Sequence, residues 1–443
     1  MTPVRGAIPE PALEGAAADG AYVALRDGTV GPSALDELLA KGRLRATLAM
    51  LGPAFVASIA YVDPGNFATN LQGGAKFGFM LLWVVVLANL MAMLIQYLSA
   101  KLGIVTGRNL PESFRAHYPR WMSRGMWVQA ELITMSTDVA EFLGAALALN
   151  LLFHVPLLIA GVMTGFIAFG LLELRVHGYR RFEIAITGIL GIIFLGFIYE
   201  TFNIGPSASG AASGLVPHLG GTESLYLAVG IIGATVMPHA IYLHSALTQD
   251  RMPLRDDRER ARVLRFERTD VIIALGIAGL INMSMLAVAA QLFHGSGHTG
   301  INTIQGAHAG FGTLVGGGAA LAFAIALLAS GASSSSVGTY AGQVVMAGFV
   351  NVRISLYVRR IVTMLPALVV LALGVNPTDA LVLSQVVLSF GIPLALIPLV
   401  ILTSRGDVMG VHVNRRLTTV LAWACAVLIT GLNGFLLYLQ FFG

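Results

Sequence analysis

Two short motifs place polar side chains and prolines in the middle of apolar segments long enough to span a membrane. The first is Asp63–Asn66, with the order Asp-Pro-Gly-Asn, and the second is Met237–His239, with the order Met-Pro-His. A carboxylate, an amide and a proline are costly deep in hydrocarbon, so such residues indicate a function. A hard carboxylate together with a soft thioether favours a transition-metal ion over sodium, calcium or magnesium.

The prolines predict a break in each helix, because proline removes a backbone donor and clashes with the preceding turn. In lipid the freed carbonyl groups need partners, so a break is tolerated where it lines a cavity or binds something. The carbonyls of Ala60 and Ala234 lie three residues before Asp63 and Met237 and are candidate metal ligands. The motifs add a charged oxygen from Asp63, a neutral oxygen from Asn66 and a sulfur from Met237.

Each of these residues also has a plainer interpretation. Asn66 could cap the outer half of a broken helix. Met237 taken alone would be a packing residue, and His239 could be a core histidine with satisfied nitrogens. Their place at the second break favours a functional role for Met237 and proton chemistry for His239.

The composition indicates an integral membrane protein made of many helices. Hydrophobic residues form 56% of the chain and charged residues 11%, against about 25% charged residues in a typical soluble domain. The single cysteine excludes a disulfide framework and a zinc-finger arrangement. The chain contains no Gly-x4-Gly-Lys-Ser/Thr loop, so we expect no drive by ATP.

A spanning helix needs about 20 apolar residues. On this criterion the sequence predicts eleven spans, and the long eighth one is expected to be a single helix with extra turns. The expected spans are 47–70, 78–102, 125–150, 152–172, 181–200, 224–248, 270–293, 313–348, 357–374, 379–403 and 417–441.

The connecting segments alternate between basic and nearly uncharged. Basic residues stay on the cytoplasmic side, so the pattern predicts a cytoplasmic N-terminus and an external C-terminus in a multi-pass protein. Arg forms 24 of the 27 basic residues and Lys only three, a bias typical of GC-rich bacterial genomes, so we expect the membrane to be a bacterial inner membrane. This role of the basic residues in membrane orientation also accounts for their excess in the chain, so we expect no nucleic-acid partner. Residues 1–45 are expected to form a cytoplasmic tail, and a short amphipathic surface helix at 32–45 is the alternative.

The two motifs lie in segments that resemble each other, which indicates an internal sequence repeat. Ala60–Pro64 in the first expected span resembles Ala234–Pro238 in the sixth. Five crossings separate the two spans, so they run in opposite directions, as in inverted repeats whose broken helices meet at a central site. We expect one transmembrane domain, 46–441, built from repeats 46–200 and 222–403 with 417–441 appended.

The third expected span carries Glu131, Asp138 and Glu141, which spacings of seven and three residues place on one helical face. Acids aligned inside a span indicate a proton relay. The alternative is a buried ladder of ion pairs with Arg359 and Arg360, at the cytoplasmic start of the ninth span. Both roles can hold at once.

The two motifs together resemble the Nramp family of proton-coupled divalent metal transporters. Residues 106–110 (Thr-Gly-Arg-Asn-Leu) and 339–343 (Thr-Tyr-Ala-Gly-Gln) also fit, and the similarity covers about residues 45–441. One departure is Asn109, where the family commonly has an acid; it concerns no expected ligand.

The resemblance implies an all-α, LeuT-like fold that imports Mn²⁺ and Fe²⁺, and also Cd²⁺ and Co²⁺, with protons by alternating access. It implies no resident cofactor and no enzymatic activity; the partners are metal ions, protons and the lipid bilayer. By resemblance the metal ligands are Asp63, Asn66, Met237, the carbonyls of Ala234 and Ala60, and Gln385. The proton pathway comprises Asp63, His239, Asp138, Glu141, Arg359 and Arg360, and Glu131 has a gating or structural role.

Other functions are less well supported by the residues. A sodium-coupled organic-solute symporter of the same fold is the main alternative, and the hydroxyls of Ser333–Ser336 would suit sodium as well as close helix packing. Such a symporter has no need of an acid and a thioether at its centre. An intramembrane metalloenzyme would show a cluster such as His-Glu-x-x-His, which is missing from the sequence. A plain channel fits inverted repeats less well than alternating access.

Overall fold

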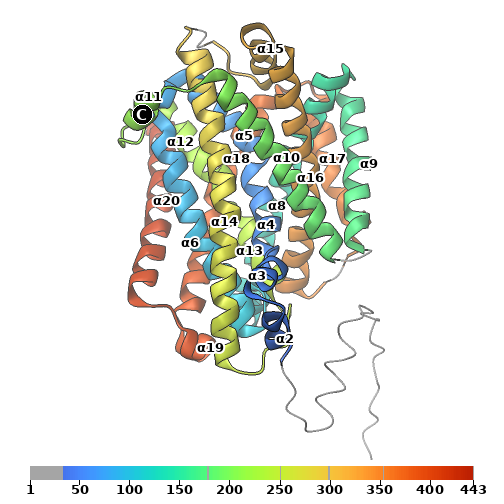
Figure 1. The fold of residues 1–443 in the computed structure, drawn as a ribbon, viewed down its shortest axis with the longest axis vertical. Helices are drawn as coiled ribbons and strands as arrows, with labels where there is room; N and C mark the ends of the chain where they lie inside the picture. The colour runs from blue at the N-terminus through green and yellow to red at the C-terminus, as the bar shows by residue number, and fades with distance from the viewer. Residues whose placement is uncertain (1–32, 177–178, 250, 298–299, 353, 443) are drawn as a thin grey trace, which may run out of the picture.

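Long apolar helices run alongside one another through the molecule (Figure 1). The computed structural model describes residues 33–176, 179–249, 251–297, 300–352 and 354–442, and within them the secondary structure is entirely helical. Eight of the described helical segments are long and apolar enough to cross a membrane, and Pro53–Val62 and Leu157–Leu171 are shorter apolar segments. The expected all-α architecture is therefore confirmed.

The first half of the chain follows the expected spans with shifted ends. Gly52 (φ 154°) precedes the first core helix and Gly78 (φ 59°) ends the segment that was expected to stop at residue 70. Both conformations favour glycine. The elements are α2 (Ala34–Ala40), α3 (Arg43–Met50), α4 (Pro53–Ser58), η1 (Ile59–Val62), α5 (Pro64–Phe77), η2 (Gly78–Leu81), α6 (Leu82–Thr106), α7 (Leu110–His117), α8 (Arg120–Phe153), α9 (Leu157–Val176) and α10 (Tyr179–Ile204).

The second half contains one further difference. The span expected at 313–348 is one long helix, but it begins at Gly317, because a turn at Gly316 (φ 132°) separates it from the preceding helix. The elements are α11 (Ala208–Ser213), α12 (Thr222–Thr235), α13 (Pro238–Thr248), α14 (Asp257–Ala289), η3 (Ala290–His294), α15 (Ile304–Leu314), α16 (Gly317–Val350), α17 (Leu356–Ala372), α18 (Pro377–Thr403), α19 (Gly406–Met409), η4 (Gly410–His412) and α20 (Arg416–Phe442).

The helical backbone hydrogen-bonding pattern is interrupted at both motifs. Asp63 has an extended backbone between η1 and α5, and Val236 and Met237 are non-helical between α12 and α13. A proline follows each interruption as the first residue of the next helix, where its missing N–H costs nothing. The two motifs therefore start helices in the interior of the protein.

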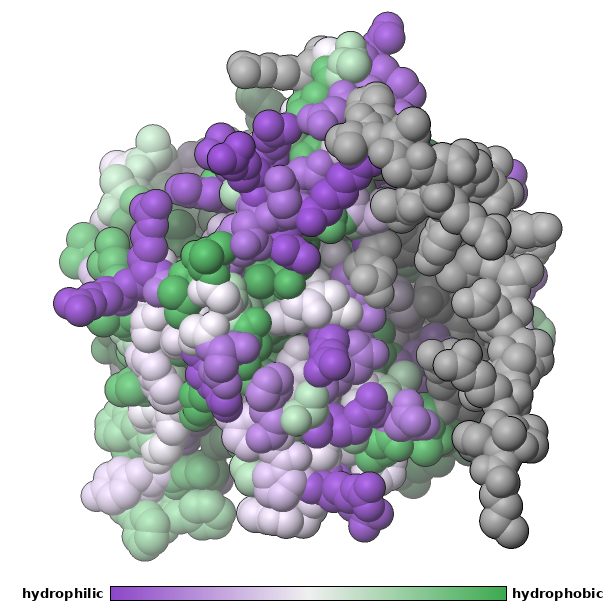
Figure 2. Space-filling view, turned by 90° about the horizontal axis from the view of Figure 1, so that it is seen from below, coloured by the Kyte–Doolittle hydropathy of each residue, from purple (hydrophilic) through white to green (hydrophobic). Residues whose placement is uncertain are grey.

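The N-terminal segment packs onto the lower end of the molecule. Leu35 of α2 is buried against Met50, Ile104 and Val263. The earlier part of the expected tail, residues 1–32, lies outside the described residues. Hydrophilic side chains gather across the lower face, and hydrophobic ones lie toward its margin (Figure 2). The C-terminus lies at the opposite end from α2 (Figure 1).

Candidate metal site

Asp63 lies at the junction of η1 and α5, where its side chain caps α5. Its backbone is extended (φ −77°, ψ 169°), and its Oδ1 atom accepts a 2.8 Å hydrogen bond from the backbone N–H of Asn66. Aspartate is a preferred N-cap residue, and proline is common directly after it. The local sequence thus holds a carboxylate in place at a helix start in the middle of an apolar segment. The cap is Asp63, and not Asn66 as the alternative interpretation had it.

The side chain of Asn66 joins the two interruptions. Its Nδ2 atom donates to Asp63 Oδ1 at 2.8 Å and to the carbonyl oxygen of Ala234 at 2.9 Å. The hydroxyl of Thr235 lies 3.5 Å from Asn66 Oδ1. Three residues that the sequence predicted as ligands therefore meet in one cluster, although 168 positions separate Asn66 from Ala234.

Gln385 reaches the same cluster from α18. Its Nε2 atom lies 3.5 Å from Asp63 Oδ2. A Cβ atom at Gly65 would collide with the Gln385 amide, and one at Gly233 would collide with the Gln385 carbonyl. Glycine at these two positions therefore lets α18 approach both interruptions closely. Asp63, Asn66 and Gln385 are all fully buried.

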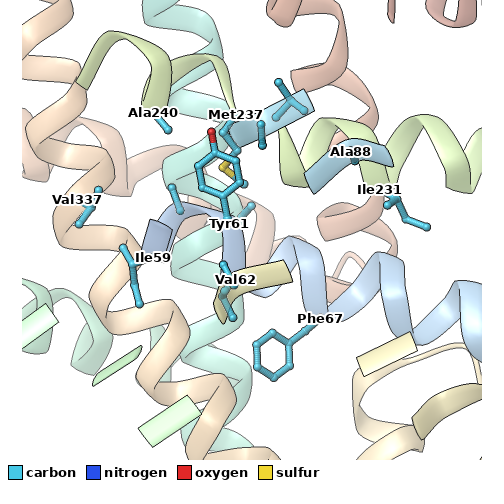
Figure 3. Packing of buried hydrophobic residues seen from close by; sticks show 14 of the residues in the cluster. Ile59, Tyr61, Val62, Phe67, Ala88, Ile231, Met237, Ala240 and Val337 are labelled. Carbon is cyan, nitrogen blue, oxygen red and sulfur yellow. The ribbon is translucent and has the colours of Figure 1, made fainter. Parts of the chain in front are cut away.

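Met237 and Ala60 lie in the same buried region. Met237 precedes the first residue of α13, Ala60 lies in η1, and both are fully buried in the apolar cluster that surrounds the interruptions. Figure 3 shows the Met237 sulfur among these apolar side chains. Among the described residues, no hydrogen bond joins the Met237 sulfur to the side chain of Asp63. The structure thus joins Asp63, Asn66, Ala234 and Gln385 by hydrogen bonds, and it places Met237 at the second interruption, three residues after Ala234.

The chemistry of the cluster is that of mixed oxygen and sulfur donors. In the ranges that the structure describes, no three His, Cys, Asp or Glu side chains gather where they could hold a metal ion. A divalent ion here would have to bind one carboxylate with amide, carbonyl and thioether groups. In the structure the Asn66 NH₂ group lies between two of the candidate oxygen ligands. A cation at that point requires Asn66 to turn its acceptor oxygen inward, because the amide NH₂ only donates.

The carbonyls freed before Asp63 have polar partners. Asn282 of α14 donates to the Tyr61 carbonyl at 2.7 Å, and Ser330 of α16 donates to the Val62 carbonyl at 2.5 Å. Asn70 of α5 in turn donates to Asn282 at 2.9 Å. These side chains stabilise an interrupted backbone that could not persist unpaired in an apolar interior. The sequence analysis missed all three, although a polar residue inside an apolar span is the available signal.

The acids of α8 face the two arginines of α17. Glu131 Oε1 forms an ion pair with Arg359 Nη2 at 2.7 Å, and Asp138 Oδ1 lies 3.8 Å from Arg360 Nη1. Arg360 also bonds Ser335 of α16. The structure therefore contains two of the ion pairs that the sequence offered as an alternative to a relay, whereas Glu141 forms none within the described residues.

Glycine residues on α16 make room for these charges. A Cβ atom at Gly338 would lie 2.5 Å from Glu141 Oε2 and 3.1 Å from Asp138 Oδ1. A Cβ atom at Gly342, one turn later, would overlap the guanidinium of Arg359. The carboxylates of Asp138 and Glu141 thus lie against the same point of α16.

His239 connects the second interruption to α8. Its Nδ1 atom lies 3.3 Å from the hydroxyl of Thr137, the residue before Asp138. No partner for its Nε2 atom is found in the described part of the chain. His239 is therefore placed between the interruption and the acidic face of α8.

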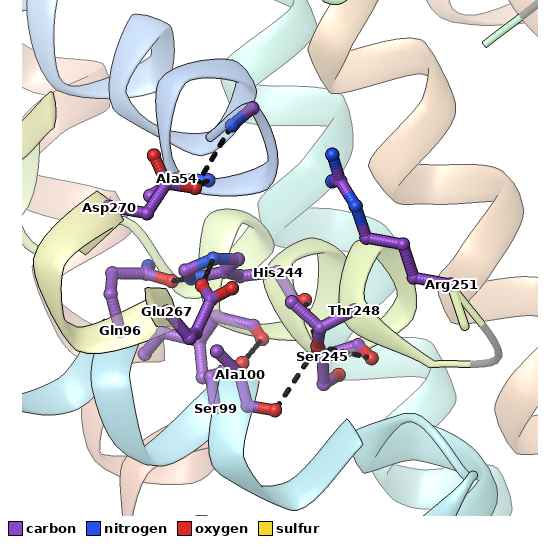
Figure 4. A network of polar contacts seen from close by, with 12 residues as sticks. Ala54, Gln96, Ser99, Ala100, His244, Ser245, Thr248, Arg251, Glu267 and Asp270 are labelled. Atoms are coloured by element: carbon purple, nitrogen blue, oxygen red, sulfur yellow. Dashed lines mark hydrogen bonds and ion pairs between the residues drawn. The ribbon is translucent and has the colours of Figure 1, made fainter. Parts of the chain in front are cut away.

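A second buried polar chain starts at the first interruption and was not predicted from the sequence (Figure 4). Gln96 of α6 donates to the Tyr61 hydroxyl, and its Oε1 atom lies 2.8 Å from His244 Nδ1. His244 Nε2 lies 2.9 Å from Glu267 Oε1 on α14. The rule that singled out Asp63 would have found Gln96 and His244 too, since both lie inside apolar segments.

Two further acidic residues, Asp270 and Glu183, anchor α4 and α10. Asp270 Oδ2 accepts hydrogen bonds from the backbone N–H groups of Gly52 at 3.1 Å and Ala54 at 3.0 Å. Glu183 of α10 pairs with Arg251 at 2.8 Å. These contacts tie the start of the first interrupted segment to α14 and tie α10 to the end of the second.

Comparisons with known proteins agree with this architecture. The model of the family described as natural resistance-associated macrophage protein-like matches residues 54–439. A relative from Deinococcus radiodurans, named divalent metal cation transporter MntH, is 52% identical over 411 residues, which cover 93% of this chain and 92% of the relative. A solved manganese transporter from Eremococcus coleocola is 34% identical with a TM-score of 0.81, covering 88% of this chain and 87% of that one.

A more distant structure shares the fold alone. Mhp1, a nucleobase-cation-symport-1 family transporter, is 13% identical with a TM-score of 0.57, covering 88% of this chain and 91% of that one. The likeness supports the LeuT-like arrangement of helices that the sequence resemblance implied.

Proposed function

The chain belongs to the natural resistance-associated macrophage protein-like (Nramp) family, and from that premise we propose that it carries divalent transition-metal ions across a membrane. The proposed substrates are Mn²⁺ and Fe²⁺, with Cd²⁺ and Co²⁺ as further ions, and the proposed driving force is a proton gradient. The observation that carries the proposal is the buried meeting of Asp63, Asn66 and the Ala234 carbonyl at two helix interruptions. The relatives are transporters by name and not enzymes.

The proposed ligand set combines hard and soft donors. Asp63, Asn66 and the Ala234 carbonyl supply oxygens, and Met237 supplies the sulfur. The Ala60 carbonyl and Gln385 complete the set in some conformations of the carrier. One carboxylate among neutral donors suits a transition-metal ion, whereas Ca²⁺ and Mg²⁺ prefer all-oxygen sites.

The proposed proton route leaves the metal site through α8. Asp63 and His239 stand at its start, Asp138 and Glu141 form its middle, and Arg359 and Arg360 lie at its cytoplasmic end. The 3.3 Å separation of His239 Nδ1 and Thr137 Oγ1 supports the first step, because it brings the imidazole to the acid-bearing helix. Glu131, which is paired with Arg359, acts as a gating or structural residue.

The proposed topology has eleven spans, with the first and sixth broken at the two motifs. Repeats 46–200 and 222–403 are inverted, and 417–441 is the added span. The alternation of basic segments supports a cytoplasmic N-terminus, and the bacterial relatives support a location in a bacterial inner membrane. The positions of α2 and the C-terminus at opposite ends of the molecule are compatible with an odd number of crossings.

The runner-up, a sodium-coupled symporter of organic solutes, has weaker support. Carriers of that class place a substrate carboxylate at the N-terminus of a half-helix. Here the Asp63 carboxylate already accepts from the backbone N–H of Asn66 at the start of α5. A second carboxylate at this place would meet a like charge.

The test is uptake of radioactive ⁵⁴Mn²⁺ into proteoliposomes, with an internal pH dye, in the presence and absence of a pH gradient. We expect uptake that is faster with an acidic exterior and is accompanied by internal acidification. Asp63→Asn should abolish uptake, since it removes the only charge among the proposed ligands. Asparagine is also a good N-cap, so α5 should persist, and circular dichroism and size-exclusion chromatography check this.

Two controls separate the alternatives. Asp407→Asn changes an exposed carboxylate that pairs with Arg405 and should leave uptake unchanged. A sodium gradient without a pH gradient should not drive uptake. Near-normal uptake by Asp63→Asn would overturn the site, and drive by sodium alone would overturn the proton coupling.

A further inference from the structure

A groove of about 610 Å³ lies at the lower end of the molecule between α6, α14 and the segment from η4 to α20. It is distinct from the interruptions and takes no part in the proposed transport route. Its lining carries five basic side chains and no acidic one. The basic residues are Lys101, Arg265, Arg268, His412 and Arg415.

Lys101 gives the groove a buried positive charge without a matching acid. The side chain is only 8% exposed, and its Nζ atom donates to the neutral Asn414 Oδ1 at 2.8 Å. Within the described residues this is the only hydrogen bond of the Lys101 side chain, whose ammonium group has three donors. A buried charge is costly unless an opposite charge compensates it, so the site calls for an anion from outside.

The wall that holds Lys101 is rigidly built. Asn414 donates from its side chain to Thr403 Oγ1 at 2.8 Å and from its backbone to the Thr403 carbonyl at 3.1 Å. These bonds fix the segment before α20 to the end of α18. The ammonium of Lys101 is therefore held at a defined place in the groove.

The arginines around it are also free of acidic partners. No carboxylate lies within 4 Å of Arg265, Arg268 or Arg415 in the part of the chain that the structure describes. His412 is the exception among the basic residues, with Nε2 3.5 Å from Asp257, which also pairs with Arg260. The groove thus keeps four cationic side chains, those of Lys101, Arg265, Arg268 and Arg415, available for a ligand.

Above the charges the groove continues into apolar surface. Met93, Leu94 and Val271 line it. Exposed apolar side chains continue along the same three helices, with Leu90 on α6 58% exposed, Leu280 on α14 53% and Val420 on α20 63%. A ligand that fills the site would therefore join an anionic group to a long apolar part.

We propose that this groove binds an anionic phospholipid, whose phosphate contacts Lys101, Arg268 and Arg415 while its acyl chains lie along α6, α14 and α20. Basic pockets between membrane helices on the cytoplasmic side suit acidic head groups. The proposal is independent of the transported ion. The proposed topology enters only in assigning the groove to the inner leaflet.

The test uses the full-length protein, delipidated in neutral detergent and titrated with dioleoyl phosphatidylglycerol. Native mass spectrometry counts the bound lipid, and thermal unfolding reports the stabilisation. Arg265→Gln/Arg268→Gln/Arg415→Gln should weaken binding by about fivefold for each charge removed. Lys101→Gln should also weaken lipid binding, yet leave the Tm of the lipid-free protein unchanged or higher, because it removes an uncompensated buried charge.

The matched control is Arg120→Gln/Arg124→Gln/Arg258→Gln, which removes the same charge from exposed arginines outside the groove. It should bind phosphatidylglycerol like the unaltered protein. Phosphatidylcholine or inorganic phosphate at equal concentration should give little stabilisation. The proposal is overturned if the control loses as much binding as the groove variant, if phosphatidylcholine or phosphate stabilises equally, or if Lys101→Gln retains full lipid binding.

Discussion

The thioether sulfur of Met237 is the donor that matters most for the proposed metal selectivity. We expect Met237→Leu to shift preference away from Cd²⁺ and toward Ca²⁺, because the substitution keeps most of the volume but removes the soft donor. Competition of Cd²⁺ and Ca²⁺ against Mn²⁺ uptake measures the change. Met91→Leu is the control, since Met91 is also a buried methionine but lies on α6, outside the two motifs. An unchanged ratio of Cd²⁺ to Ca²⁺ would make Met237 a packing residue.

Individual site residues could be predicted from the sequence where a polar side chain or a proline break is unusual for an apolar span. Asp63, Asn66 and the Ala234 carbonyl were expected together and are joined by hydrogen bonds. The contact of Gln385 with Asp63 rested on the family resemblance alone. An amide in an apolar helix is equally compatible with an ordinary interhelical hydrogen bond, so its partner depends on tertiary structure.

Among the secondary-structure elements, α8 and α17 carry the charges proposed for the proton route. Asp138→Asn should reduce proton flux and the pH dependence of uptake. Metal affinity should stay largely intact, because Asp138 faces Arg360 and not the proposed metal ligands. Calorimetric titration with Mn²⁺ and the pH dye in liposomes measure the two properties separately. Asp138 leaves the relay if its variant keeps full proton flux or loses metal affinity as Asp63→Asn does.

The glycine face of α16 offers a test that alters no charge. Gly338→Ala places a methyl group 2.5 Å from Glu141 Oε2 and 3.1 Å from Asp138 Oδ1, so the two carboxylates must move. We expect slower proton-coupled uptake with near-normal Mn²⁺ binding. Gly188→Ala on α10 is the matched helical control, since its Cβ would meet nothing within 4 Å. Equal uptake by both variants would show that the spacing between α8 and α16 is unimportant for transport.

Helix boundaries were predictable where local chemistry sets them. The prolines at 64 and 238 mark helix starts in the structure. The break between α15 and α16 was missed, because Gly316 lies among other glycines and hydropathy alone does not resolve a turn there. Gln96 and His244 could have been marked by the rule that marked Asp63, but their contacts with each other and with Glu267 depend on the packing of three helices that are distant in sequence.

At the scale of the whole molecule, the proposed topology places α2 and the end of α20 on opposite sides of the membrane. We expect Gln440→Cys, in a Cys425→Ser background, to react with a membrane-impermeant maleimide added to intact cells. Glu37→Cys in the same background should react only after the cells are permeabilised. Both positions are exposed in the structure, so access depends on sidedness. Labelling of both in intact cells would exclude an odd number of crossings.

The hydrogen bonds of Asn66 have a consequence for turnover. Its amide NH₂ group donates to both the Asp63 carboxylate and the Ala234 carbonyl, so these two candidate ligands can be held by hydrogen bonds in place of bonds to a cation. A carrier built in this way can reset while empty, and its return step need not wait for a counter-ion. Net accumulation of Mn²⁺ should then proceed nearly as fast as one-for-one exchange between Mn²⁺ on the two sides of the vesicle. Asn66→Ala, which loses the bridge, should slow net accumulation more than exchange.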